Sequence, residues 1–174
     1  YKKKRSSLSE EERLKMSEKA LAKLVNCDDY KNANHIFAFI NMGTEINTII
    51  AIKKFLEDGK KVYVPITKKG EKEMKFTRLR DLNHLVQGNF NVPEPSEEYI
   101  EYVDHNLADL ILVPGLSFDT RGYRTGYGGG FYDRFFAGIT TECTKVGYCF
   151  STQLSQEDLP TDQYDIAVDY VITD

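Results

Sequence analysis

A glycine-rich segment is the part of this sequence whose residue types most directly suggest chemistry. Five of the 12 glycines fall within residues 122–130, GYRTGYGGG. Glycine loses more backbone entropy on folding than any other residue, and a tight turn needs only one or two glycines. We therefore interpret the segment as a loop whose backbone amides approach phosphate oxygens, with a following helix adding its positive end. An ordinary turn is the simpler alternative.

The charged residues around the glycines fit the same chemistry. Arg121, Arg124 and Arg134 flank the loop, and a guanidinium offers paired donors to phosphate. Asp133 follows the loop, and Mg²⁺ is commonly bound by one or two carboxylates together with substrate phosphates. The alternative for Asp133 is charge compensation at a helix N-terminus. A GxGxxG fingerprint would require glycine at Phe131, and no Lys-Ser or Lys-Thr pair follows as in a P-loop, so the segment predicts a different kind of phosphate loop.

The elements that must position this loop begin with a helix and a strand–helix–strand unit. Ser9 and Glu12 have the spacing of a capping box, which predicts a helix that starts there. Residues 35–40 and 61–67 are apolar throughout and predict buried strands. Thr44 can cap a helix between them that ends before Gly59, giving a βαβ unit. The apolar face of the first helix is expected to be Leu14, Leu21, Leu24 and Val25.

The second half of the chain continues the alternation. Residues 74–79 predict a more exposed strand, residues 88–95 an irregular loop, and residues 109–113 the most buried strand. A helix over 131–136 and strands over 145–150 and 167–173 complete the pattern. The expected fold is α/β, with an open, mostly parallel sheet in a three-layer arrangement. Ligands bind beyond the carboxyl ends of the strands in such sheets, where the segment after residue 113 would lie.

Composition limits the functional classes. The length of 174 residues indicates a single domain, residues 1–174. The net charge of 23 − 27 = −4 argues against a general nucleic-acid partner. No apolar run reaches the roughly 20 residues of a membrane span. Three cysteines without CxxC spacing predict neither a disulfide framework nor a zinc site, which favours a reducing, cytoplasmic setting.

Beyond these residue-level inferences, the sequence resembles a known family. Residues 113–136, VPGLSFDTRGYRTGYGGGFYDRFF, are similar to the signature of 5-formyltetrahydrofolate cyclo-ligase, also called 5,10-methenyltetrahydrofolate synthetase. Residues 5–13 (RSSLSEEER), 45–48 (EINT), 91–95 (NVPEP) and 159–174 (LPTDQYDIAVDYVITD) resemble other parts of that family in the same order. The resemblance thus spans essentially the whole chain.

The resemblance implies an ATP- and Mg²⁺-dependent ligase that converts 5-formyltetrahydrofolate to 5,10-methenyltetrahydrofolate and releases ADP and phosphate. It also implies a fold related to ribose-5-phosphate isomerase and CoA transferases. The expected partners are small molecules, 5-formyltetrahydrofolate and MgATP, and the expected state is a monomer. In the family scheme, the formyl oxygen is phosphorylated before the ring closes.

The resemblance also implies roles for particular residues. Arg124 and Asp133 would be catalytic, Asp133 and Asp165 would hold the metal, and Ile40 and Glu45 would contact the folate. For Glu45 alone a helix-capping charge is an equal alternative, and for Asp165 alone a surface role is the simpler interpretation. The residues expected to bind ATP are Arg124, Thr125, Gly126, Tyr127, Gly128, Gly129, Gly130, Phe131 and Tyr132, and those from Tyr127 to Phe131 would also approach the folate.

Two departures from the family and two rival functions qualify these expectations. Family members carry a lysine and a Leu-Arg pair in a segment that would precede Tyr1; the charge run at Lys2, Lys3, Lys4 and Arg5 either substitutes for them or is a solvated segment. Tyr164 stands where relatives often have histidine. The rivals are a non-catalytic nucleotide- or RNA-binding module of the same fold and a fold-related isomerase or CoA transferase. His35, His84 and His105 lack metal-ligand spacing and are expected to be structural.

Overall fold

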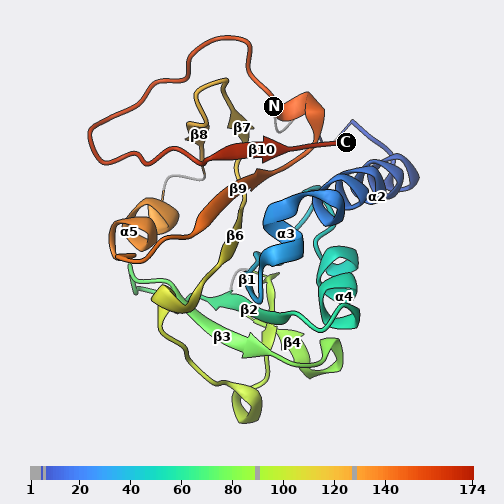
Figure 1. The fold of residues 1–174 in the computed structure, drawn as a ribbon, viewed down its shortest axis with the longest axis vertical. Helices are drawn as coiled ribbons and strands as arrows, with labels where there is room; N and C mark the ends of the chain where they lie inside the picture. The colour runs from blue at the N-terminus through green and yellow to red at the C-terminus, as the bar shows by residue number, and fades with distance from the viewer. Residues whose placement is uncertain (1–4, 6, 89–90, 127–128) are drawn as a thin grey trace.

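The computed structural model describes residues 5, 7–88, 91–126 and 129–174, and its main feature is a six-stranded sheet (Figure 1). The strand order is β10-β9-β6-β1-β2-β3, and every neighbouring pair is parallel except β2 with β3. The predicted open, mostly parallel α/β sheet is therefore confirmed. The strands are β1 (His35–Phe37), β2 (Lys61–Ile66), β3 (Lys75–Leu79), β6 (Leu110–Val113), β9 (Thr144–Tyr148) and β10 (Tyr170–Ile172).

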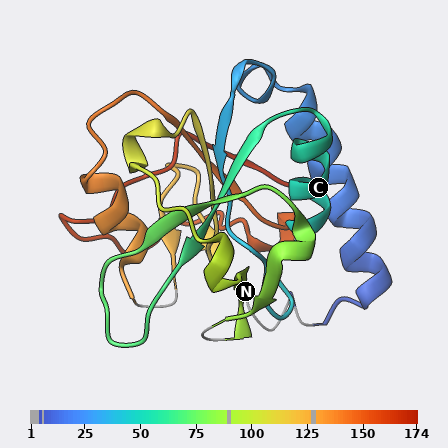
Figure 2. The same cartoon turned by 90° about the horizontal axis from the view of Figure 1, so that it is seen from below.

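Helices cover both faces of the sheet, which gives three layers. α2 (Glu10–Asn26), α3 (Asp28–Asn32) and α4 (Ile49–Glu57) lie on one side, and α5 (Phe131–Ala137) lies on the other (Figures 1 and 2). Successive side chains of a strand point to opposite faces. Ile36 and Leu110 accordingly pack in the core under α2 and α4, whereas Phe37 and Ile111 pack in the core under α5. Because both faces of the sheet are covered, its central strands are apolar along their length.

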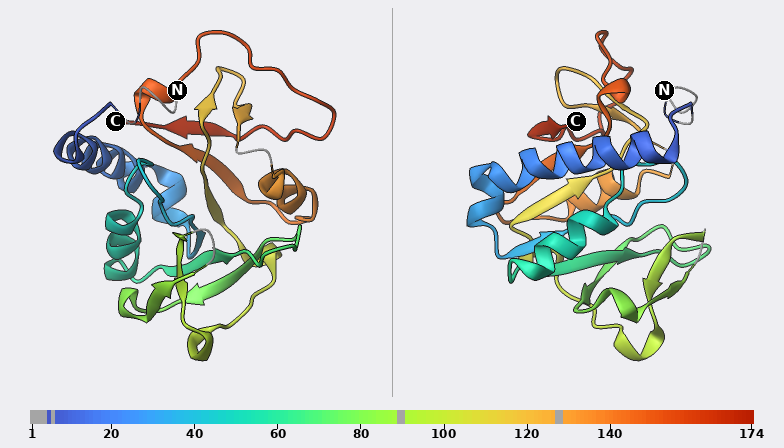
Figure 3. Two further views of the ribbon diagram at one scale, coloured as in Figure 1. Left: turned by 180° about the vertical axis from the view of Figure 1, so that it is seen from behind. Right: turned by 90° about the vertical axis from the view of Figure 1, so that its right-hand side faces the viewer.

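The first helix begins as predicted but buries a partly different face. The Ser9 side chain accepts a hydrogen bond from the Glu12 N–H at 3.1 Å, so the N-terminal cap is present. Figure 3 shows α2 and α4 side by side over the sheet. Leu24 is fully buried, but Leu14 is 41% exposed, so its expected place on the core face was wrong. The helix turns Ser17 and Ala20 inward instead.

The second helix starts later than predicted. α4 begins at Ile49 rather than after Thr44, because residues 41–48 form a loop held by side-chain hydrogen bonds. The Asn41 Oδ1 atom accepts the Thr48 N–H at 3.0 Å, and the Thr48 Oγ1 atom accepts the Asn41 N–H at 2.9 Å. These two bonds offer the backbone a local alternative to an earlier helical turn. Ile46 is buried within the loop, which explains its apolar character without a helix.

The segment between β2 and β6 differs most from expectation. β3 pairs antiparallel with β2, and its Phe76 and Leu79 are buried, so the prediction of a more exposed strand was wrong. Residues 93–95 were predicted to lie in an irregular loop, but β5 (Pro93–Pro95) pairs with β4 (Leu85–Gln87). Proline is tolerated here because this is a two-stranded ribbon with open edges. Short 3₁₀ turns complete the segment: η1 (Leu82–His84), η3 (Glu97–Tyr99) and η4 (His105–Leu107).

A small hairpin precedes the glycines. β7 (Ser117–Phe118) pairs with β8 (Arg124–Thr125), and the buried Asp119 closes the connection by accepting N–H bonds from Arg121, Tyr123 and Leu159. Burial alone would raise the pKa of Asp119, but these bonds and the Arg121 guanidinium lower it overall. Leu159 belongs to the segment between η5 (Ser151–Gln153) and β10, so the hairpin is tied to that segment.

We expect Gly122→Ala to lower the free energy of unfolding by about 1–3 kcal/mol. Gly122 has φ of +85°, and a Cβ there would overlap the carbonyl oxygen of Val168. Gly126→Ala is the matched control, because its Cβ would meet no atom within 4 Å, and we expect a change within about 0.5 kcal/mol. Urea unfolding of both variants measures the difference. Equal stabilities would show that the hairpin does not depend on this close approach.

Candidate active site

A cavity of about 670 Å³ opens at the carboxyl ends of β1, β2 and β6. Phe39 and Ile40 follow β1, Thr67 follows β2, and Pro114 follows β6, and all four line it. The predicted position beyond the strand ends is thus where the structure has its large cavity. Ile40 and Glu45, expected to contact the folate, both line this cavity.

The glycine-rich segment forms one wall. Gly126, Gly129 and Gly130 line the cavity and lead into α5. Gly130 has φ of +64° and is the N-cap residue of α5, where no side chain caps the helix. Phe131, Tyr132 and Asp133 continue the wall. Tyr127 and Gly128 lie outside the described residues, and Thr125 pairs with Ser117 in the hairpin without lining the cavity, so their predicted contacts with ATP stay predictions.

Of the three arginines that flank the glycines, Arg124 is the one that lines the cavity. Arg121 pairs with Asp119 at 2.8 Å and donates to the Leu159 carbonyl, so it secures the hairpin. Arg134 donates two hydrogen bonds to the Lys72 carbonyl and lies over the Phe131 ring. Arg121 and Arg134 do not line the cavity, and some of their donors already bond to a carboxylate or to backbone carbonyls, so a phosphate contact from either stays a prediction.

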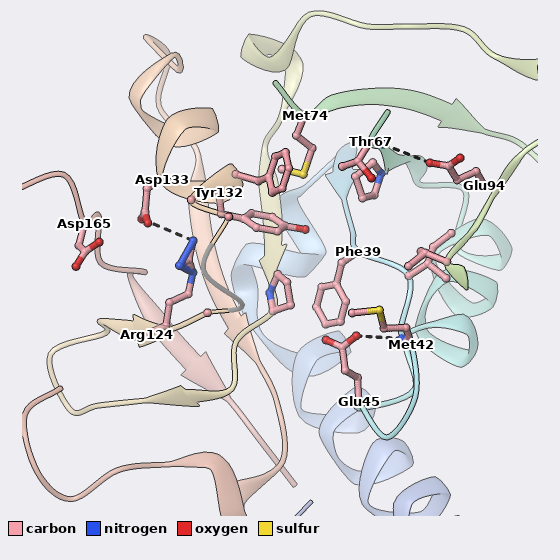
Figure 4. Close-up of a pocket in the computed structure, with 18 of the residues that line it drawn as sticks. Phe39, Met42, Glu45, Thr67, Met74, Glu94, Arg124, Tyr132, Asp133 and Asp165 are labelled. Atoms are coloured by element: carbon pink, nitrogen blue, oxygen red, sulfur yellow. Dashed lines mark hydrogen bonds and ion pairs between the residues drawn. The ribbon is translucent and has the colours of Figure 1, made fainter. Parts of the chain in front are cut away.

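Arg124 is held in a definite orientation (Figure 4). Its side chain is only 8% exposed, and its Nη2 atom lies 3.6 Å from the Asp133 Oδ1 atom. The guanidinium carbon lies 5.6 Å from the centre of the Tyr132 ring and 5.9 Å from that of Phe136. Its buried Nε–H has no hydrogen-bond partner within the described part of the chain. An unmet buried donor favours an anionic ligand.

Asp133 and Asp165 both line the cavity on the side of Arg124 (Figure 4). The Asp133 Oδ1 atom accepts the Ile166 N–H at 3.1 Å, and the Asp165 Oδ2 atom accepts the Asp162 N–H at 2.9 Å. Asp162 also lines this end and was not predicted. Within the described ranges no three His, Cys, Asp or Glu side chains form a ready metal cluster. Two carboxylates fit Mg²⁺ that takes its other ligands from phosphates and water.

Glu45 lies at the opposite side of the cavity floor. It is 9% exposed, and its Oε1 atom accepts the Met42 N–H at 3.0 Å. Burial raises the pKa of its carboxyl, although the Met42 bond and the Arg5 charge partly oppose this. Arg5 is 3% exposed and donates to the Thr44 Oγ1 atom at 3.1 Å, which places it in the protein interior rather than in a solvated charge run. Lys2, Lys3 and Lys4 lie outside the described residues.

Apolar residues that sequence reasoning did not single out line the rest of the cavity. Phe39, Met42, Pro65, Met74 and the polar Thr67 contribute from the ends of β1 and β2 and the segments after them, and Val92 and the polar Glu94 contribute from the β4–β5 ribbon. They come from positions far apart in the chain. The signal for Val92 and Glu94 was the NVPEP segment, which resembles a part of the family but predicted no particular ligand contact.

The histidines and Tyr164 have no place in this site. His35 Nδ1 contacts the Tyr63 hydroxyl at 2.9 Å, His84 stacks on Tyr99, and His105 Nε2 contacts the Gly138 carbonyl at 2.7 Å. The predicted structural role of the histidines is therefore confirmed. Tyr164 is 74% exposed.

No helix in the described part of the chain combines the length and apolar character needed to span a membrane. This agrees with the short apolar runs of the sequence.

Comparison with known proteins identifies the family. The model of the 5-formyltetrahydrofolate cyclo-ligase family matches residues 1–174. A mouse 5-formyltetrahydrofolate cyclo-ligase is 29% identical over 95% of this chain and 86% of its own length, and the enzyme from Escherichia coli K12 is 27% identical over 97% and 93%.

Solved structures agree with the sequence relatives. The 5,10-methenyltetrahydrofolate synthetase of Aquifex aeolicus superposes with a TM-score of 0.82 at 34% identity, covering 97% of this chain and 83% of that one. A synthetase from Mycoplasma pneumoniae, at 21% identity and a TM-score of 0.78, shares the fold. With the whole chain matched by the family model, this protein belongs to the 5-formyltetrahydrofolate cyclo-ligase family.

Proposed function

We propose that the cavity at the carboxyl ends of β1, β2 and β6 is where the chain carries out the family's reaction. That reaction is the ATP-dependent cyclisation of 5-formyltetrahydrofolate to 5,10-methenyltetrahydrofolate, with release of ADP and phosphate. The activity follows from family membership. The observation that supports this location is that one cavity joins an end with Arg124 and carboxylates to an apolar end.

The chemistry explains why two substrates must meet in one cavity. The oxygen of a formamide is a poor leaving group, so the formyl oxygen attacks the γ-phosphorus of ATP and the bond to ADP breaks. The N10 amine of the folate then attacks the activated carbon and loses its proton, and the carbon–oxygen bond breaks to release phosphate. Both displacements depend on placement and on neutralising charge.

Arg124 and the glycine wall would bind the phosphates. The backbone N–H groups of Gly129 and Gly130 lie at the start of α5, in a wall without bulky side chains. Arg124 would supply a charge-assisted donor beside them. Because Tyr132 and Phe136 hold its guanidinium, little reorganisation is needed when charge develops on the transferred phosphoryl group.

Asp133 and Asp165 would hold Mg²⁺, which, when bound, neutralises phosphate charge. Asp133 also pairs with Arg124, so the carboxylate that would contact the metal keeps the arginine at the same end of the cavity. Glu45 and Ile40 would contact the folate. Figure 4 shows Glu45 on the other side of Tyr132 from Arg124.

Absorbance of the methenyl product tests the function directly. We expect wild-type protein to form it from 5-formyltetrahydrofolate only with MgATP, and Arg124→Met to lower the rate about a hundredfold, the typical cost of losing one such donor. Methionine retains apolar packing against Tyr132 and Phe136. Arg80→Met is the control, because Arg80 pairs with Glu101 away from the cavity. A wild-type protein that binds both substrates without forming product would support the non-catalytic module, and near-normal turnover of Arg124→Met would remove Arg124 from its role.

We expect Asp133→Asn to raise the Mg²⁺ concentration needed for half-maximal nucleotide binding by at least about tenfold, the lower end of what losing a metal-site partner costs. Asparagine can still accept the Ile166 N–H, which limits structural damage. Calorimetric titration of a non-hydrolysable ATP analogue at several Mg²⁺ concentrations measures the shift without turnover. Asp158→Asn is the control, since Asp158 is exposed and pairs with Arg121. An unchanged Mg²⁺ dependence would exclude Asp133 as a ligand.

The buried carboxyl of Glu45 predicts a pH effect on stability. Its pKa is raised in the folded state, so the folded protein binds this proton more tightly than the unfolded chain. Its contribution to stability is therefore full below the unfolded pKa, about 4.3, and is lost as the pH rises through the folded pKa. Because glutamine does not ionise, Glu45→Gln removes this loss of stability at high pH.

We expect the free energy of unfolding of Glu45→Gln, relative to wild type, to be higher at pH 8 than at pH 4. Urea unfolding at the two pH values gives this difference. The exposed Glu142→Gln provides the control, with the same change of charge but no burial. A difference between Glu45→Gln and wild type that does not vary with pH would contradict the assignment.

A further inference from the structure

Glu94 is a second carboxylate in the apolar part of the cavity. It lies in the middle of β5 and lines the cavity together with Val92 and Thr67. Its Oε2 atom accepts the Thr67 N–H at 3.3 Å, which joins the β4–β5 ribbon to the end of β2 (Figure 4). Figure 4 shows Glu94 on the opposite side of the cavity from Arg124.

The ribbon restricts the Glu94 side chain further. The Gly88 N–H donates to the Val92 carbonyl at 3.0 Å, which brings the backbone of Gly88 next to Glu94. A Cβ at Gly88 would overlap the Glu94 carboxylate, so glycine is what lets the carboxylate lie there. Because Thr67 and the Gly88 backbone both restrict it, the Glu94 carboxylate would lose little conformational entropy when a ligand binds.

The surroundings of Glu94 select the chemistry of that ligand. Phe39, Pro65 and Met74 are apolar residues that line the same cavity, and Glu45 is a further carboxylate of its lining. Two carboxylates in an apolar region repel anions and favour N–H donors. A carboxylate can accept about four hydrogen bonds, so Glu94 can accept N–H bonds from a ligand in addition to those it accepts within the protein.

The two ends of 5-formyltetrahydrofolate differ in whether they present N–H donors or carboxylates. Its reduced pterin ring carries an exocyclic amino group and a ring N–H side by side, whereas its glutamate tail carries carboxylates. The pyrimidine half of the ring is flat and largely apolar on its faces, which suits walls made of Phe39, Pro65 and Met74. The tail would bring negative charge towards Glu45 and Glu94. The pterin end therefore matches this part of the cavity, and the tail does not.

We infer that Glu94 is a substrate-binding residue that accepts N–H hydrogen bonds from the pyrimidine edge of the reduced pterin, with the glutamate tail directed away from it. This inference rests on the proposed function, since it takes 5-formyltetrahydrofolate as the ligand. It places the folate ring on the Glu94 side of the cavity and the nucleotide phosphates on the Arg124 side.

Glu94→Gln separates this role from a structural one. Glutamine can still accept the Thr67 N–H but replaces one acceptor oxygen with an NH₂ group that faces the N–H donors of the ring. We expect the Kd for 5-formyltetrahydrofolate, measured by calorimetry without ATP, to rise at least about tenfold, the scale of one lost charge-assisted hydrogen bond. The Kd for a non-hydrolysable ATP analogue is expected to stay the same. Glu97→Gln, an exposed glutamate three residues along, is the matched control.

A second arm uses the wild-type protein, so the outcome does not depend on the variant folding. A 5-formyltetrahydrofolate analogue that lacks the exocyclic amino group should bind wild type at least about tenfold more weakly than the parent compound, for the same reason. In Glu94→Gln the two compounds should bind with similar affinity.

Three results would overturn the inference. The first is a Glu94→Gln variant that binds 5-formyltetrahydrofolate as tightly as wild type, and the second is wild type that does not distinguish the analogue. The third is an equal loss of affinity for folate and nucleotide with a lower melting temperature, which would mark Glu94 as an anchor of the ribbon only. Failure of the proposed function is separate, because it appears as absent ATP-dependent product from wild type.

Discussion

The contact on which the site most depends is the pair between Arg124 and Asp133. It connects β8 to α5 across the glycines, and the same carboxylate accepts the Ile166 N–H from the segment before β10. Three parts of the chain therefore meet at one carboxylate. A buried ion pair adds little net stability, because desolvation offsets most of the attraction. Its value here is positional: it holds a guanidinium and a carboxylate at one end of a cavity, where the Tyr132 and Phe136 rings also restrict the guanidinium.

The rest of the cavity follows from how the sheet is covered. β1, β2 and β6 are buried on both faces, so their carboxyl ends are the place where backbone turns away and leaves room for a ligand. The α5 side contributes charge and bare glycine backbone, whereas the ends of β1 and β2 contribute most of the apolar side chains and the β4–β5 ribbon adds Val92 and Glu94. The two walls of the cavity therefore suit ligand groups of different character. Anionic phosphate is suited to the first wall, and a ring system with a flat pyrimidine edge that carries N–H donors is suited to the second.

Much of the fold was predictable from sequence where a pattern has a local cause. The Ser9 cap, the apolar strands and the start of α5 after the glycines depend on neighbours within a few residues. The errors arose where partners are distant or compete. Asn41 and Thr48 replaced the expected first turn of α4 with a loop, and Phe76 was covered by α5, which contacts it through Phe135. Pro93 was compatible with pairing because its strand has an open edge.

The sequence by itself determined the chemical types of the site: a glycine-rich phosphate loop, an arginine and aspartates near it, and an α/β sheet to carry them. Only the tertiary structure decided which members of each type take part. Arg121 and Arg134 found partners at Asp119 and Lys72, while Arg124 was left facing the cavity. Asp162 and Glu94 joined the lining from segments with no glycine signal. Residue type and local pattern can be seen directly in the sequence. The neighbours of a side chain, in contrast, depend on packing between segments that are far apart in sequence.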